Sequence, residues 1–427
     1  MSNDANLDNF DNFATVDTVV AALGQRARGA ARMLARAPTA QKADALTRAA
    51  TAMRAAAPAI LAANAQDMAA AAHLSPAMRD RLLLDPVRLE SVAAALEAVA
   101  GLPDPVGRTI DATERPNGLK LARIRVPIGV IGIIYESRPN VTADAAALCV
   151  MAGNVAILRG GSEAVHSNHA LHAAFVTGLV AAGLPADAVQ LVPTQDRAAV
   201  GAMLAAADTL DLIIPRGGKG LVARVQAEAR VPVLAHLDGV NHVYVDASAN
   251  PAMAARIVRD AKLRRTGVCG AMECLLIDRA YPDPASLVRG LADAGCEVRA
   301  GAALRELAPE LSQARGSDWG REYLDAVAAA DLVDGVEGAI AHIARYGSHH
   351  TDAIVTEDVG VAELFLAEVD SAIVLWNAST QFADGGEFGL GAEIGIATGR
   401  LHARGPVALE GLTTYKWVGR GSGQVRG

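Results

Sequence analysis

The chain has 427 residues, enough for two or three domains at ~150 residues each, which excludes a peptide hormone or a zinc knuckle. Hydrophobic residues make up 52% of the chain and charged residues 20%, so it can bury enough apolar surface to fold. The formal net charge of −8 disfavours binding to nucleic acid or to an anionic membrane surface. We therefore expect a folded protein without a polyanionic partner.

The sequence carries no pattern typical of secretion or membrane insertion. Residues 1–17 contain four Asp and no basic segment before an apolar one, unlike a secretory signal. The longest runs without charged residues or His, 145–158 and 173–186, fall short of the ~20 residues that a membrane span requires. Four cysteines are too few for a disulfide framework. These patterns predict a cytoplasmic protein with reduced thiols.

The first quarter of the chain is predicted to be helical. Residues 1–17 are polar and are expected to form a flexible tail. From Val19 to about Leu102, apolar residues recur every three or four positions, which predicts packed amphipathic helices. Residues 119–126 then alternate apolar and polar side chains before the sequence becomes continuously apolar. This pattern indicates an edge strand or a paired strand that leads into a buried one.

Strand and helix patterns then alternate over more than a hundred residues, which predicts a parallel sheet covered by helices. The expected strands are 155–158, 190–192, 210–214, 231–234 and 243–246, and the expected helices include 143–152 and 166–182. A second unit of the same kind follows, with helices at 253–263, 287–294, 339–346 and 361–369 and strands at 274–277, 353–355, 372–375 and 411–418. The fold class is therefore predicted to be α/β.

Two strand-to-helix turns combine small residues with a cation, the composition of a phosphate-binding turn. They are Arg159-Gly160-Gly161-Ser162 and Arg216-Gly217-Gly218-Lys219. No dinucleotide fingerprint follows an early strand, and the second turn lacks the Ser or Thr of a P-loop. Such a turn is more often structural when it occurs alone, but two at strand ends of one sheet favour a nucleotide site.

One of the four cysteines stands in a loop suited to chemistry. Gly267 and Gly270 bracket Cys269, which leaves the sulfur reachable, and Arg264 and Arg265 are expected to lower the pKa of its thiol. The other three cysteines lie in apolar helix or strand patterns, where Cys is usually a small buried hydrophobe. A lone Cys in a loop is more often structural than catalytic, so this residue needs independent support.

The histidines do not predict a metal site. His166, His169 and His172 recur at three-residue spacing on an expected helix, which could present two ligands on one face. No carboxylate or Cys nearby completes a site, so a solvated helix face is the better interpretation. The pair His349-His350 is ambiguous. We predict no metal.

Several long stretches, in order along the chain, carry a resemblance to a known family. They are VPIGVIGIIYESRPNVTADAAALC, GNVAILRGGSEA, RRTGVCGAMECLLID, YGSHHTDAIVTED, VDSAIVLWNAS, DGGEFGLGAEIGI, LHARGP and LTTYKW. From about residue 18 onward, the chain closely resembles the gamma-glutamyl phosphate reductase family of the aldehyde dehydrogenase superfamily. The resemblance implies an aldehyde dehydrogenase-like fold, with two parallel-sheet α/β domains and a small β oligomerisation element.

The family layout gives expected domain boundaries. After the tail, residues 18–107 and 128–239 would form an NADPH-binding domain and 240–400 a catalytic domain. Residues 108–127 and 401–427 would form the oligomerisation element of a homodimer or homotetramer. A transient contact with glutamate 5-kinase, which makes the unstable substrate, is also expected.

The resemblance also implies roles for individual residues. Cys269 matches the nucleophile and Asn140 the side-chain donor of an oxyanion hole. Arg159 and its turn would hold the adenosine ribose and the 2′-phosphate of NADPH, and the turn at 216–219 would lie near the pyrophosphate. Glu322 would position the nicotinamide ribose. Candidates for the anionic groups of the substrate are Arg138, Arg264 and Arg404.

The implied reaction is the NADPH-dependent reduction of L-glutamyl 5-phosphate to L-glutamate 5-semialdehyde with release of phosphate, through a thioester on Cys269. This is the second step of proline biosynthesis from glutamate. Hydrolytic aldehyde dehydrogenases carry a glutamate that activates water, whereas residues 235–242 contain none. That difference fits phosphate, rather than water, as the group that exchanges with the thiol on the acyl carbon. The alternatives are a hydrolytic aldehyde dehydrogenase and a nucleotide-binding scaffold without activity.

Two residues depart from the family pattern. Asn241 stands where relatives often have Cys, which suggests that turnover requires no second thiol. Gly270 stands where they have Asn or a similar residue, which puts in question one hydrogen bond beside the nucleophile. Neither departure removes a step of the implied mechanism.

Overall fold

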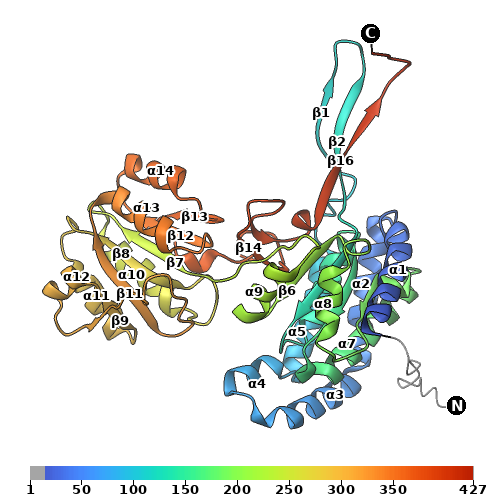
Figure 1. Ribbon diagram of the computed structural model, residues 1–427, viewed down its shortest axis with the longest axis horizontal. Coiled ribbons are helices and arrows are strands. Elements are labelled where there is room, and N and C mark those ends of the chain that lie inside the picture. The colour runs from blue at the N-terminus through green and yellow to red at the C-terminus, as the bar shows by residue number, and fades with distance from the viewer. Residues whose placement is uncertain (1–14, 427) are drawn as a thin grey trace. The chain divides into compact units, whose positions relative to one another are not determined.

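The structure, a computed structural model, describes residues 15–426, so most of the predicted tail lies outside the described residues. Helix α1 (Val16–Leu34) begins directly after Thr15, whose hydroxyl accepts a hydrogen bond from the backbone N–H of Thr18. The chain divides into two compact units, one formed by the residues up to Leu234 together with those from Ala408 onward, and one formed by Ala235–Val407 (Figure 1).

The sheet of the first unit has four parallel strands in the order β5-β4-β3-β6. The strands are β3 (Val130–Tyr135), β4 (Val155–Arg159), β5 (Val189–Leu191) and β6 (Leu212–Arg216). Every residue of β3 and β4 is buried, which explains their continuously apolar sequence. The strand expected at 231–234 is wrong, because Val233 forms only an isolated bridge to Ile213.

Helices cover this sheet and form most of the first unit. They are α1, α2 (Thr39–Ala55), α3 (Ala57–Ala70), α4 (Pro76–Leu82), α5 (Pro86–Ala100), α6 (Val141–Met151), α7 (Val165–Ala181), α8 (Ala198–Ala205) and α9 (Lys219–Glu228). Small residues let them approach closely: a Cβ at Gly178 of α7 would lie 2.3 Å from the backbone nitrogen of Ala49 in α2. The amphipathic helices predicted from 19 to 102 are confirmed.

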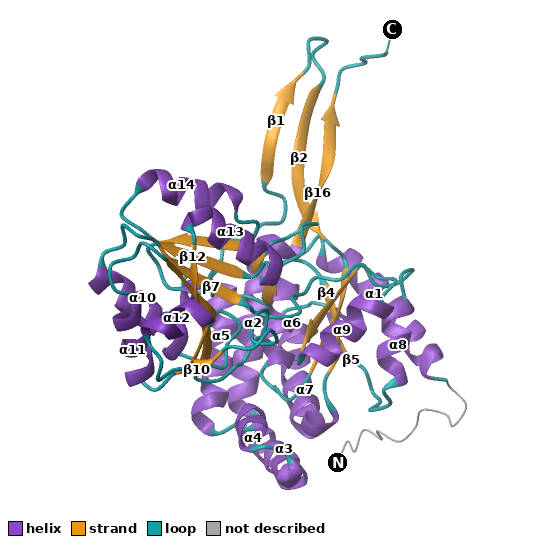
Figure 2. Cartoon of the chain, turned by 60° about the vertical axis from the view of Figure 1, so that its left-hand side comes forward, coloured by secondary structure: helices purple, strands orange, loops and turns teal. Residues whose placement is uncertain are grey.

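A three-stranded antiparallel sheet, which we call the arm, extends away from the helices of the first unit (Figures 1 and 2). It consists of β1 (Thr109–Glu114), β2 (Lys120–Pro127) and β16 (Thr413–Arg420), in the order β1-β2-β16. The paired strand predicted at 119–126 is therefore confirmed. Every residue of β1 is exposed, and so are the aromatic side chains of Tyr415 and Trp417 on β16.

The second unit is built on a seven-stranded parallel sheet in the order β10-β9-β11-β8-β7-β12-β13. The strands are β7 (Asn241–Val245), β8 (Met272–Asp278), β9 (Glu297–Ala300), β10 (Ser312–Gln313), β11 (Val327–Val333), β12 (Thr351–Val355) and β13 (Ile373–Trp376). Its helices are α10 (Pro251–Leu263), α11 (Pro284–Asp293), α12 (Ala302–Leu307), α13 (Gly335–Tyr346) and α14 (Val359–Glu368). A short antiparallel pair, β14 (Gly395–Ala397) and β15 (Gly405–Val407), completes the unit.

Both units are α/β structures with parallel sheets, so the predicted fold class is confirmed. Among residues 15–426, none of the helices combines the length and the apolarity that crossing a bilayer would need.

Candidate active site

The loop that carries Cys269 (residues 264–271) connects α10 to β8 in the second unit. Its first residues are held by Gln381, whose side-chain Nε2 donates to the backbone oxygens of Ala261 at 3.0 Å and Arg265 at 3.2 Å. Cys269 is half-buried, whereas Cys149, Cys274 and Cys296 are buried. Burial raises the pKa of the Cys149 thiol to about 12 and that of Cys296 to about 11, which makes both thiols poor nucleophiles.

Asn241, the first residue of β7, holds the other end of this loop. Its Nδ2 donates to the backbone oxygen of Cys269 at 2.6 Å and to that of Ala271 at 2.8 Å. Its Oδ1 accepts a hydrogen bond from the backbone N–H of Thr351 at 3.1 Å. The amide is fully buried, so its two N–H groups and its oxygen all find partners inside the protein. A departure from the family pattern is thus the residue that fixes the backbone of Cys269 to β7 and β12.

Close backbone contacts leave little freedom around Cys269. A Cβ at Gly239 would lie 2.1 Å from the backbone oxygen of Cys269, and one at Gly270 would lie 3.1 Å from the backbone oxygen of Thr380. The second departure, Gly270, therefore stands where a larger side chain would have to displace its neighbours. The backbone N–H of Gly239 donates to Oε1 of Glu322 at 3.0 Å, so this carboxylate lies in the second unit and contacts the segment of Gly239 that packs against Cys269.

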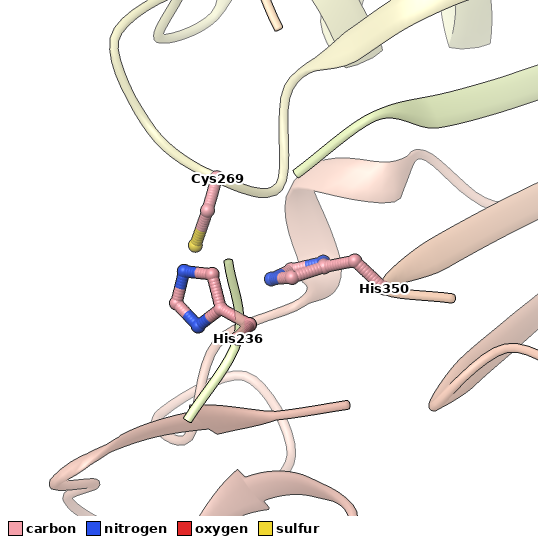
Figure 3. A group of neighbouring side chains, drawn as sticks. All are labelled: His236, Cys269 and His350. Carbon is pink, nitrogen blue, oxygen red and sulfur yellow. The ribbon is translucent and has the colours of Figure 1, made fainter. Parts of the chain in front are cut away.

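Two imidazoles that were not predicted as site residues lie beside the Cys269 sulfur. Nδ1 of His236 lies 2.8 Å from the backbone oxygen of Ile396. Because a carbonyl oxygen only accepts, Nδ1 carries the proton and Nε2 of the neutral ring keeps its lone pair. Figure 3 shows this second nitrogen beside the sulfur, with the ring of His350 turned toward the same point. One ligand atom from each of the three side chains lies within 4.8 Å of the other two.

His350 belongs to the ambiguous pair in the sequence and is fully buried just before β12. Burial, with a smaller contribution from His236, lowers the pKa of its imidazole to about 3, so the ring is neutral at neutral pH. Nδ1 lies 2.9 Å from the hydroxyl of Thr351, whereas Nε2 is buried without a hydrogen-bond partner.

The one signal that could have indicated His236 is its position in the segment where hydrolytic relatives carry a glutamate.

A buried ion pair links the two elements that flank the nucleophile loop. Nζ of Lys262, at the end of α10, lies 2.6 Å from Oε2 of Glu273, at the start of β8, and both side chains are almost fully buried. Burial raises the pKa of Glu273 to about 7, against the opposing effect of the lysine charge. Removing either partner would leave an uncompensated buried charge, so the pair strongly constrains where the loop begins and ends.

The two predicted phosphate-binding turns lie in the first unit, at the carboxyl ends of the two strands that flank β3. Arg159 ends β4 and Arg216 ends β6, and both strands pair with β3. In open parallel sheets a ligand binds beyond the carboxyl ends of the strands at a reversal of strand order, here between β3 and β6. The turns are tied to the segment after β3, because the backbone N–H of Gly218 donates to Glu136 at 2.8 Å and that of Ser137 donates to Glu163 at 2.6 Å.

Arg159 is largely buried and bonds mainly to backbone. Nη1 donates to the oxygen of Gly160 at 2.8 Å and Nη2 to that of Gln195 at 3.0 Å, while Nε is buried without a partner. Burial lowers the pKa of Arg159, and the positive charge of Arg197 contributes to the same shift. A buried donor without a partner, close to a second cation, is suited to bind a negatively charged group such as a phosphate. Sequence reasoning missed Arg197.

The remaining predicted residues are divided between the units. Asn140, in the first unit, donates from Nδ2 to Asp144 at 2.8 Å, and burial raises the pKa of that carboxyl to about 6. Arg138 follows β3 in the same unit. In the second unit Arg264 is exposed, whereas Arg404 pairs with Asp370 at 2.6 Å. The proposed oxyanion and substrate roles of these residues stay predictions.

Comparison with known proteins agrees with the fold. Residues 11–315 match the model of the aldehyde dehydrogenase family. Proteins called gamma-glutamyl phosphate reductase from Sphingopyxis alaskensis and Rhizorhabdus wittichii are 69% and 68% identical to the chain, and each alignment covers 96% of both sequences. The crystal structure of the protein of that name from Thermotoga maritima superposes with a TM-score of 0.94 at 42% identity, over 96% of this chain and 100% of the other.

The chain is therefore an oxidoreductase of the aldehyde dehydrogenase class, and the predicted aldehyde dehydrogenase-like fold is confirmed. Within that class it belongs to the gamma-glutamyl phosphate reductase family.

Replacing Asn241 with Asp should lower the reactivity of Cys269 more than it lowers the stability of the fold. A carboxylate oxygen would face two backbone oxygens where Nδ2 now donates. We expect kcat to fall by ~100-fold because the nucleophile is displaced. The nearby negative charge should also raise the thiol pKa, which moves the pH profile of Cys269 alkylation upward.

Asn250→Asp is the matched control. Asn250 caps α10 by accepting the backbone N–H of Met253 at 3.0 Å, and Asp serves equally well at such a position. A kcat and an alkylation profile that are the same in both variants would show that Asn241 does not position the nucleophile.

Proposed function

We propose that this chain reduces L-glutamyl 5-phosphate to L-glutamate 5-semialdehyde with NADPH and releases phosphate, the second step of proline biosynthesis from glutamate. The observation that carries the proposal is Cys269, held in a fixed loop next to the imidazole of His236. The names of the close relatives supply the substrate class. The absence of a glutamate from residues 235–242 favours transfer to phosphate over hydrolysis.

The chemistry begins at the sulfur. Nε2 of His236 accepts the thiol proton, and the thiolate of Cys269 attacks the acyl carbon. The bond from that carbon to the phosphate oxygen breaks, a thioester forms, and the imidazolium returns its proton to the departing phosphate. NADPH, when bound, supplies the hydride that reduces the thioester. The carbon–sulfur bond then breaks, which releases the aldehyde and regenerates the thiolate. The amide of Asn140 is the proposed donor to the acyl oxygen.

The first unit is the proposed cofactor domain, with residues 240–400 as the catalytic domain. Support comes from the two glycine turns at the carboxyl ends of the strands on either side of β3, one of which borders the reversal of strand order, and from the unpaired Nε of Arg159. The charges of Arg159 and Arg197 would favour the 2′-phosphate of NADPH over the hydroxyl of NADH. The turn at 216–219, at the N-terminus of α9, would hold the pyrophosphate. Glu322 remains the proposed partner of the nicotinamide ribose.

The reaction class is tested in the reverse direction. Reduction of NADP⁺ by L-glutamate 5-semialdehyde should require added phosphate and should be lost in Cys269→Ser. Cys274→Ala is the control, because Cys274 is a buried thiol on β8 and should be dispensable. Equal rates without phosphate would instead identify a hydrolytic aldehyde dehydrogenase. A wild-type protein inactive in both directions would support the nucleotide-binding scaffold.

Cofactor preference is tested at Arg197. Arg197→Ala should raise the KM for NADPH by about tenfold, the effect of one lost charge-assisted hydrogen bond, and leave the KM for NADH unchanged. Arg48→Ala removes an exposed arginine that pairs with Asp44 within α2 and should alter neither constant. A parallel rise for both cofactors would contradict a role at the 2′-phosphate.

The arm is the proposed oligomerisation element, in a homodimer or homotetramer. Tyr415 and Trp417 are exposed on β16, with the guanidinium of Arg123 over both rings at 5.2 and 5.7 Å. Exposed aromatic side chains on a projecting sheet are typical of an interface. Trp417→Glu should therefore reduce the mass measured by light scattering to that of one chain, whereas Val359→Glu, at an exposed position of α14, should not. A monomeric wild type would refute the assignment.

We also propose a cytoplasmic location, which the four cysteines outside disulfides support. Cell fractionation tests it. A transient contact with glutamate 5-kinase is a further proposal, which co-sedimentation of the two purified proteins tests.

A further inference from the structure

We propose that Cys269, His236 and His350 form a binding site for a soft or borderline divalent cation such as Zn²⁺, and that the bound cation blocks the nucleophile. The binding half of this proposal stands on the geometry of the three side chains alone. The inhibitory half rests on the proposed function, in which Cys269 attacks the substrate.

The donor set and its spacing suit such a cation. The three ligand atoms lie within 4.8 Å of one another, so small side-chain movements can bring all of them onto one ion (Figure 3). Thiolate sulfur and imidazole nitrogen are the donors that Zn²⁺ prefers in proteins, and three of them leave a fourth position for water. The three donors come from separate segments, the loops before β7 and after α10 and the residue before β12.

Each imidazole turns one ring nitrogen toward the Cys269 sulfur (Figure 3). The backbone oxygen of Ile396 fixes the proton of His236 on Nδ1, which leaves Nε2 to coordinate. Such a partner on the second nitrogen is characteristic of histidines that ligate metals. His350 provides independent support: its side chain is fully buried, Nδ1 contacts the hydroxyl of Thr351, and Nε2 has no partner. A buried nitrogen without a hydrogen bond is costly, and a cation would satisfy it.

Coordination exchanges a proton for the metal. The S–H bond of Cys269 breaks, a sulfur–metal bond forms, and one proton passes to solvent, while both imidazoles bind as neutral rings. No group is oxidised or reduced. The thiolate lone pair that would attack the acyl carbon is then shared with the cation, so the nucleophile is blocked until a chelator removes the metal.

A second group of the same composition provides the competing site. His242, Cys274 and His342 also bring three ligand atoms within 4.8 Å, and Asp352 lies 2.9 Å from Nδ1 of His242. Cys274, however, is buried in the middle of the sheet. Burial and the neighbouring carboxylates of Asp331, Asp352 and Glu273 raise the pKa of its thiol well above the usual value. Cys269, half-buried in a loop, is easier for a cation to reach.

Titration of the full-length protein with Co²⁺ tests the site without relying on activity. The protein is reduced with a phosphine and freed of metal with a chelator beforehand. We expect a thiolate-to-cobalt charge-transfer band that saturates at one equivalent, is displaced by Zn²⁺, and accompanies release of one proton. The band should be absent in Cys269→Ala and retained in Cys274→Ala. His236→Gln and His350→Gln should each weaken binding at least ~10-fold.

A band that is absent from the wild type, that survives Cys269→Ala, or that disappears in Cys274→Ala would overturn the proposal. Wild-type protein provides a second measurement that does not depend on how the variants fold: Zn²⁺ should slow alkylation of Cys269 by iodoacetamide at least ~10-fold, and a chelator should restore the rate. Unchanged alkylation with Zn²⁺ present would also overturn it. An enzyme that reduces the acyl phosphate but shows none of these effects keeps the proposed function and loses this inference.

Discussion

The position of Cys269 depends on one buried amide, that of Asn241. The Cys269 loop has no regular secondary structure, so no helix or strand ladder holds its backbone. Asn241 replaces that ladder with two donated hydrogen bonds and one accepted bond, which join the loop to β7 and β12. Because the amide is fully buried, each of these bonds lies in a low-dielectric interior, where a missing partner is costly. The buried pair of Lys262 and Glu273 fixes the ends of α10 and β8 on either side.

Much of the fold could be predicted because its elements have the periodicity that their burial requires. The buried strand β3 is a continuous apolar run and β4 is apolar up to its last residue, whereas the partly buried arm strand β2 alternates. The failures have a physical reason as well. Residues 231–234 look like a strand, but a short apolar run does not reveal whether a neighbour is available to pair with it. The sequence predicted no element between 295 and 338, although β11 lies there. This strand contains three consecutive buried alanines, and alanine has a low strand propensity.

The candidate site was only partly predictable. The glycines that bracket Cys269 and the family motifs mark Cys269 as the proposed nucleophile, and the glycine turn after β6 borders the reversal of strand order, as a phosphate-binding turn should. Local spacing could not reveal His236 or His350, because only the folded chain brings them to the sulfur. The same limit applies to Asn241, which looked like the loss of a thiol. Its function depends on two carbonyl oxygens that lie far along the chain.

The lone pair that makes His236 a proton acceptor for Cys269 also makes it a ligand for a cation. Protons and divalent metals compete for the same imidazole nitrogen and the same sulfur, so a site that activates a thiol by proximity to neutral imidazoles acquires metal affinity from the same geometry. His350 strengthens that affinity without any proposed part in proton transfer, since its Nε2 is buried with no partner. The reactivity of the Cys269 thiol and its sensitivity to thiophilic cations are then two consequences of one arrangement. Because the loop around Cys269 is fixed, the sulfur cannot move away from the imidazoles, and the two properties stay linked.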